Sequence, residues 1–166
     1  MVQLSSWLRP IATLPVGLFI TFSQAHGPDI GLLAFMAFAL VFGIGSLVFA
    51  KENRSWVPLG IVSLVALVLA GVAITQVEDL LRGLYLSVVG FWATVVAIYD
   101  LYLARKAGFS ERAGRDYLIS SVLTFGLALL FLVANLDSVS AVGFFGAYTI
   151  LVGVHWGIAA AGPKTK

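Results

Sequence analysis

The feature that most limits what this chain can fold into is a series of long apolar runs that are almost free of charge. A membrane-spanning helix needs about 20 mostly apolar residues, whereas a spanning β-strand shows about 10 residues in which polar and apolar positions alternate. Segments 32–42 and 62–72 lack that alternation. We therefore predict an all-α integral membrane protein with six transmembrane helices, near residues 11–23, 30–50, 57–75, 83–103, 117–134 and 139–161.

The composition supports one membrane domain over residues 1–166. The chain is 60% hydrophobic and 11% charged, whereas soluble domains carry about 25% charged residues. Six spans consume roughly 120 positions, which leaves no room for a second domain, so we expect a single helical bundle. The absence of cysteine excludes disulfides, thiolate metal ligands and cysteine nucleophiles, and a net charge of +2 is too small to indicate a nucleic-acid partner.

The basic residues predict the orientation, because lysine and arginine near span ends are retained on the cytoplasmic side. Of the ten basic residues, Arg82 alone falls on one predicted side. The others fall on the opposite side: Arg9, Lys51, Arg54, Arg105, Lys106, Arg112, Arg115, Lys164 and Lys166. We therefore expect both termini to be cytoplasmic.

The first run has an alternative interpretation. Arg9, the apolar stretch after it and the small-residue sequence Ser23-Gln24-Ala25 could form a cleaved signal peptide. Cleavage would leave five helices and an external N-terminus. We favour retention, because a signal peptide normally carries more than one basic residue before its apolar run, and because an even helix count agrees with basic residues at both chain ends.

Small residues four positions apart indicate internal repetition. Such steps let two helix backbones approach closely, since van der Waals contact replaces the hydrophobic force that lipid does not supply. The second, fourth and sixth predicted helices each contain one step: Ala39 with Gly43, Ala93 with Ala97, and Gly153 with Gly157. This pattern favours three consecutive helix pairs over two inverted three-helix halves, and we predict a helix-packing role for these residues.

Four local patterns link the chain to a known family. They are Leu14-Pro15-Val16-Gly17-Leu18, the Gly43-Ile44-Gly45 step, the basic link from Lys51 to Trp56 followed by Pro58, and the longer basic link from Arg105 to Arg115. With these patterns the chain resembles the HdeD-like acid-resistance membrane proteins over nearly its whole length. The resemblance implies a six-helix bacterial inner-membrane protein built from helix pairs, with a role in envelope or acid-stress tolerance. It supplies no substrate, cofactor or catalytic residue.

Two ionisable residues within the apolar runs are candidates for proton handling, since charge inside a membrane marks function by default. Asp100 lies three residues before the end of its predicted helix, where we favour a solvated carboxylate beside the basic link. His155 lies deeper, and two interpretations stay open for it: a neutral imidazole bonded to another helix, and a proton-handling role. If their helices pack together, the two could share a proton, which would suit a small proton or solute transporter.

The sequence predicts no enzyme. The chain has two histidines, His26 and His155, on opposite predicted sides, so a metal site is not expected. No Gly-x-Ser motif accompanies a candidate serine nucleophile. An intramembrane enzyme is therefore the least favoured alternative, and we expect no cofactor.

The expected function is non-enzymatic association with membrane lipids, with other membrane proteins or with a second copy of the chain. The candidate contacts for anionic lipid headgroups are Arg105, Lys106, Arg112 and Arg115, because each basic residue near such a surface contributes about 1 kcal/mol. The transporter using Asp100 and His155 is the main alternative.

Overall fold

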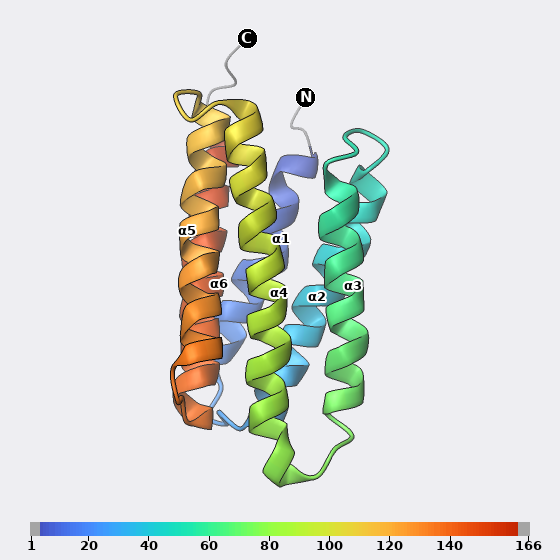
Figure 1. Ribbon diagram of the computed structural model, residues 1–166, viewed down its shortest axis with the longest axis vertical. Coiled ribbons are helices and arrows are strands. Elements are labelled where there is room, and N and C mark those ends of the chain that lie inside the picture. Colours follow the sequence, from blue (N-terminus) through green and yellow to red (C-terminus); the bar gives the residue numbers. More distant parts are fainter. Residues whose placement is uncertain (1–3, 163–166) are drawn as a thin grey trace.

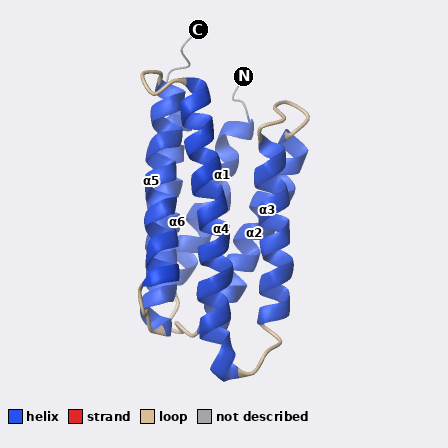
Figure 2. Cartoon of the chain, viewed as in Figure 1, coloured by secondary structure: helices blue, strands red, loops and turns tan. Residues whose placement is uncertain are grey.

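The protein is all-helical over the part of the chain that its computed structural model describes, residues 4–162 without the side chain of Glu78 (Figures 1 and 2). The helices are α1 (Leu4–Phe22), α2 (Pro28–Phe49), α3 (Trp56–Ala73), α4 (Glu78–Ala107), α5 (Arg112–Val133) and α6 (Ser138–Ala161). Five of them, α2 to α6, are long and apolar enough to cross a membrane. The predicted six helices are confirmed, and the five apolar ones indicate a multi-pass membrane protein.

Helix α1 differs most from its prediction. It begins at Leu4 rather than at residue 11, and it includes Arg9, Pro10 and Pro15. The apolar run starts only after Arg9, but the helix continues through this arginine because the side chain is buried within the protein. Helices α4 and α5 also extend beyond their apolar runs, since polar end turns continue the helical hydrogen bonding.

Helix α1 begins, and α6 ends, at the same end of the molecule as the α2–α3 and α4–α5 connections (Figure 1). We call this the terminal end. The other three connections lie at the opposite end. Besides Arg9 of α1, the basic side chains of the terminal end are Lys51, Arg54, Arg105, Lys106, Arg112 and Arg115. Lys164 and Lys166, which contributed to the predicted orientation, lie outside the described residues.

The helices pack in chain order, and α1 packs along α6 to close the series. The contact is extensive between α2 and α3, α4 and α5, and α6 and α1, and smaller between α1 and α2, α3 and α4, and α5 and α6. Helix α2 also touches α4 and α6. The even-numbered helices therefore supply the interior, with a different odd-numbered helix packed extensively against each.

Aromatic side chains from α2, α4 and α6 fill that interior. Phe38 meets Trp92 edge to face at 4.9 Å between ring centroids, and Phe35 meets Phe145 at 5.7 Å in the same manner. Such geometry is favoured by the ring quadrupoles. The buried Trp92 indole donates to Ser63 Oγ at 3.0 Å, so its polar atom has a partner.

The predicted small-residue steps lie where even-numbered helices meet odd-numbered ones. A Cβ added at Gly43 would stand 2.8 Å from Leu64 of α3, and one added at Gly153 would stand 2.6 Å from Leu14 of α1. In α4, the Ala97 carbonyl accepts from Ser121 Oγ of α5 at 2.8 Å. Three further residues of these steps remain. Ala39 and Ala93 are fully buried, and Gly157 is half-buried beside Pro10.

Candidate functional site

The candidate site is built on a buried ion pair between the first and fourth helices. Arg9 Nη2 lies 2.7 Å from Asp100 Oδ1, and Nη1 donates to Oδ2 at 2.8 Å. The Arg9 and Asp100 side chains are 6% and 0% exposed. This corrects the expectation of a solvated carboxylate at Asp100. A carboxylate buried this completely requires a cation, because an unpaired charge in a low-dielectric interior costs several kcal/mol.

Ser120 of α5 joins this pair to two further helices. Its hydroxyl donates to Asp100 Oδ2 at 2.7 Å and accepts from Arg9 Nη1 at 3.1 Å. It also accepts from the Trp156 indole of α6 at 3.1 Å. A hydroxyl offers one donor and two acceptor positions, so every hydrogen-bonding position of Ser120 is occupied.

Four aromatic rings surround the Arg9 guanidinium. Its central carbon lies 4.4 Å from the ring centroid of Trp156, with Tyr117, Trp56 and Phe42 at 5.5, 5.8 and 5.9 Å. Cation–π attraction is strongest where the cation is removed from water. The rings therefore stabilise the positive charge of Arg9, which lipid would not do. A planar guanidinium can also stack on aromatic rings, which the ammonium group of a lysine cannot do.

One nitrogen of the Arg9 guanidinium has no partner in the described chain. Its Nε is buried and has no hydrogen-bond partner within residues 4–162. Leaving a buried donor unpaired costs about 1–3 kcal/mol. Such a group next to a cavity is a candidate contact for a ligand.

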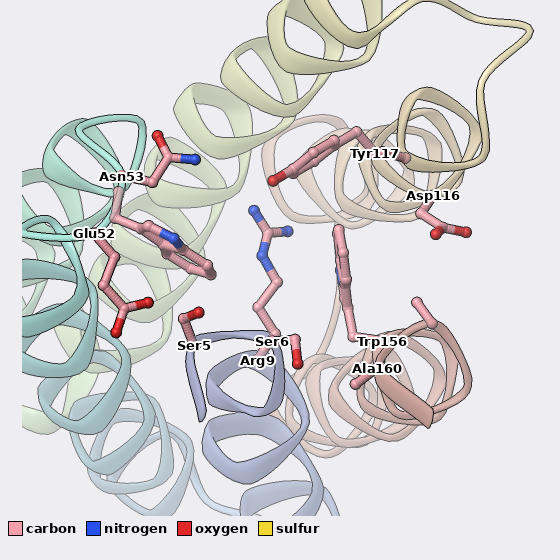
Figure 3. Close-up of a pocket in the computed structure, with 12 residues that line it drawn as sticks. Ser5, Ser6, Arg9, Glu52, Asn53, Asp116, Tyr117, Trp156 and Ala160 are labelled. Carbon is pink, nitrogen blue, oxygen red and sulfur yellow. The ribbon is translucent and has the colours of Figure 1, made fainter. Parts of the chain in front are cut away.

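A cavity of about 500 Å³ opens at the terminal end beside Arg9 (Figure 3). Its size falls within the range of small-molecule sites, roughly 300–1,000 Å³. The Arg9 guanidinium projects into the middle of the lining residues, with Trp156 beside it, and the ring centroids of Trp56 and Trp156 lie 5.8 and 4.4 Å from its central carbon. The lining residues come from α1, the α2–α3 connection, and the ends of α3, α5 and α6: Ser5, Ser6, Arg9, Glu52, Asn53, Trp56, Ala113, Asp116, Tyr117, Trp156, Ala159 and Ala160.

On its inner side the ion pair borders the aromatic interior. A second, much smaller cavity of about 20 Å³ lies there, and Arg9 lines both cavities. Thr124 Oγ1 and Tyr148 Oη, which lie 2.9 Å apart, belong to the residues around the smaller one. Phe38 and Trp92 complete much of its wall. The ion pair therefore separates an open polar cavity from a packed aromatic core.

The two residues predicted to handle protons have different partners. Asp100 bonds to Arg9 and Ser120, whereas His155 Nε2 lies 2.9 Å from the backbone oxygen of Asp116. The candidate lipid contacts occupy the last turn of α4 (Arg105, Lys106) and the first turns of α5 (Arg112, Arg115). Within residues 4–162 no three His, Asp or Glu side chains come together as a metal site would require.

Sequence reasoning missed Arg9 as a site residue because it counted this arginine among the basic residues of the cytoplasmic end. A usable signal was present. Arg9 directly precedes a long apolar segment and Asp100 interrupts another, and charged residues inside a membrane pair with one another. The aromatic residues Trp56 and Tyr117, which were not predicted as site residues from the sequence, also line the cavity.

Comparisons with known proteins add no family assignment. No family model matches the chain, and no curated protein and no solved structure matches it either. The resemblance to HdeD-like proteins stays a prediction from the sequence. The evidence for a function is the cavity and the residues around it.

Proposed function

We propose that this is a non-enzymatic, multi-pass protein of the bacterial inner membrane that binds a small molecule from the cytoplasmic side. The observation that supports this most directly is the cavity of about 500 Å³ beside Arg9. It combines aromatic walls with a few polar side chains over an ion pair that is held from four helices. An aromatic cavity with a few converging polar groups is typical of small-molecule sites.

The cytoplasmic assignment of the terminal end rests on charge. Besides the buried Arg9, six described basic residues lie at that end, whereas Arg82 lies at the opposite end. Basic residues at span ends remain in the cytoplasm during insertion. The cavity, which opens at the terminal end, is then accessible to cytoplasmic molecules and to the inner leaflet.

We propose a single bundle of three helix pairs as the scaffold. Extensive and smaller contacts alternate around the molecule with a period of two helices. In each even-numbered helix a buried aromatic residue also precedes the small residue by five positions: Phe38 and Gly43, Trp92 and Ala97, Tyr148 and Gly153. This shared spacing supports repetition of one helix-pair unit.

Binding is better supported than transport. The Asp100 carboxylate, which a proton pathway would use, is engaged by Arg9 and Ser120. Tightly packed rings follow on the inner side of the pair, whereas a transport pathway needs polar lining across the membrane. The resemblance to HdeD-like proteins supports envelope or acid-stress tolerance as the setting, with lipids, other membrane proteins or a second copy as partners.

The proposal is tested by blocking the cavity. Purified protein is screened by thermal unfolding against small cations, anions, zwitterions and neutral compounds. Ala160 lines the cavity, whereas its neighbour Ala161 is exposed and does not. We expect Ala160→Trp to abolish the stabilisation by every genuine ligand and Ala161→Trp to preserve it. If no compound stabilises the protein in a way that depends on Ala160, the proposed function is wrong.

A further inference from the structure

We infer that the cavity beside Arg9 accepts a small organic ammonium ion that carries an oxygen acceptor. This inference rests on the proposed function and names the class of ligand. Three properties of the cavity support it: the charge of its lining, the position of its aromatic rings, and the unused donor of Arg9.

The charge of the lining is negative within an end of the molecule that is otherwise basic. Arg9 is matched by Asp100, while Glu52 and Asp116 also line the cavity. Within residues 4–162 neither of these two carboxylates takes part in an ion pair. Apart from Arg9, the basic residues of the same end are not among the lining residues: Lys51, Arg54, Arg105, Lys106, Arg112 and Arg115. A cavity lined by unpaired carboxylates concentrates cations.

The aromatic rings suit a cation of low hydration. Figure 3 shows Glu52 on one side of Arg9, and Asp116 and Trp156 on the other. Trp56, which begins α3 four residues after Glu52, also lines the cavity, and its ring centroid lies 5.8 Å from the central carbon of the Arg9 guanidinium. The lining therefore contains one carboxylate and one indole ring from the segment that leads into α3, and a second carboxylate and indole ring from α5 and α6. This combination is the one that recognises alkylated ammonium groups, because the ring face and the carboxylate both attract a diffuse positive charge.

The unpartnered Nε of Arg9 is the reason to expect an oxygen acceptor on the ligand. Arg9 is 5% exposed, and its Nε finds no partner within the described chain. The other guanidinium nitrogens already donate to Asp100 and Ser120. A hydroxyl or carbonyl oxygen on the ligand would accept from Nε and remove the cost of an unpaired buried donor. A simple anion is disfavoured, since it would face Glu52 and Asp116 while the charge of Arg9 is already neutralised.

The inference is tested with choline and two analogues by isothermal titration of the purified protein. In 3,3-dimethylbutan-1-ol the charge is removed at constant shape, and in tetramethylammonium the oxygen is removed while the charge is kept. We expect choline to bind, with the neutral analogue about tenfold weaker because cation–π attraction is lost. We expect tetramethylammonium also to bind about tenfold more weakly, because one hydrogen bond to a charged donor is lost.

Variants of the lining carboxylates locate the effect. The double change Glu52→Gln with Asp116→Asn is expected to raise the Kd of choline roughly 3- to 30-fold, since each carboxylate is partly exposed to water. Glu111→Gln is the matched control, because Glu111 is an acidic residue of the same end that does not line the cavity. Its Kd should equal that of the parent.

The failures of the two proposals are distinguishable. Equal binding of choline and the neutral analogue, or tighter binding of an anion, would overturn the inference about the ligand class. The proposed function would stand in that case if the binding were still lost in Ala160→Trp. No Ala160-dependent binding by any compound would overturn both.

Discussion

A buried arginine in the first helix is held by three kinds of contact. Arg9 forms a double hydrogen bond with Asp100, a hydrogen bond with Ser120, and cation–π contacts with four rings. Removing one member of a buried pair leaves the other without compensation, which is more costly than removing both. The ion pair is therefore expected to behave as a unit when it is mutated.

The first prediction concerns this coupling. Arg9→Met and Asp100→Leu alone should each lower the free energy of unfolding by about 3–5 kcal/mol, whereas the double variant should recover most of the loss. Unfolding in detergent micelles, followed by circular dichroism, measures all three. Arg82→Met, a change at the exposed arginine of the opposite end, is the control and should be nearly neutral. Losses in the double variant that merely add would show that the two residues are not coupled.

The second prediction compares two buried serines. Ser120→Ala removes one donor and two acceptor contacts and should cost about 1–3 kcal/mol, because charged partners lose their hydrogen bonds. Ser46 is fully buried in α2, but its hydroxyl has no partner within the described residues. Ser46→Ala should therefore be neutral or stabilising. Equal destabilisation by both changes, measured by thermal unfolding, would contradict the structure.

The third prediction concerns the helix cap of α6. Asp137 accepts from Ser140 N and Ser140 Oγ, both at 2.9 Å, and these bonds hold the pKa of its carboxyl below the ordinary value of 3.8. A group with a lowered folded pKa stabilises the protein above its unfolded pKa, and loses this effect as the pH falls through the folded value. Asp137→Ala should lower Tm at neutral pH, and the difference from the parent should shrink at strongly acidic pH. A pH-independent difference would assign the effect to something other than this carboxylate.

At the level of the helices, the sequence was sufficient to predict how many helices the described chain contains and roughly where each one lies. The apolar runs from 30–50 and 139–161 differ by at most two residues at either end from α2 and α6. The start of α1 could not be predicted in this way, because Arg9 looks like a residue outside the membrane until its partner is known. That partner is 91 residues away, and hydropathy does not reveal how two helices are rotated toward each other.

The fourth prediction tests close packing between α1 and α6. A Cβ at Gly153 would lie 2.6 Å from both Leu14 and Thr13, whereas one at Gly143 of the same helix would meet nothing within 4 Å. Gly153→Ala should therefore cost about 1–3 kcal/mol by overpacking. Gly143→Ala should be neutral or slightly stabilising, since alanine is the better helix former. Thermal unfolding of the two variants side by side decides the matter, and equal stabilities would contradict the packing.

At the level of the whole molecule, the candidate site was only half predictable. Asp100 was recognised as unusual because a lone carboxylate in an apolar segment is costly. The cavity itself was not foreseen, since its lining comes from segments that are far apart in the sequence. Serines, alanines and loop acids of this kind carry no signal individually. Only the packing of α1 against α2 and α6, and of α5 against α6, brings them to one place.

The fifth prediction tests the proposed orientation, and it benefits from a chain without cysteine. Single cysteines at Asn53 and Ser110 mark the terminal end, and those at Gln76 and Leu136 mark the opposite end. In intact spheroplasts, a membrane-impermeant maleimide should label only the second pair. In inverted vesicles it should label only the first. The reverse pattern would place the cavity outside the cytoplasm.

The long interval between Arg9 and Asp100 also has a consequence for synthesis of the protein. The arginine emerges from the ribosome 91 residues before its partner, a delay of roughly 5–20 s at ordinary rates of translation. During that time the first helix carries an unmatched charge, which favours the water–lipid boundary over the bilayer interior. Helix α1 is therefore expected to settle late although it is made before α4, entering the bilayer interior only when α4 offers its carboxylate.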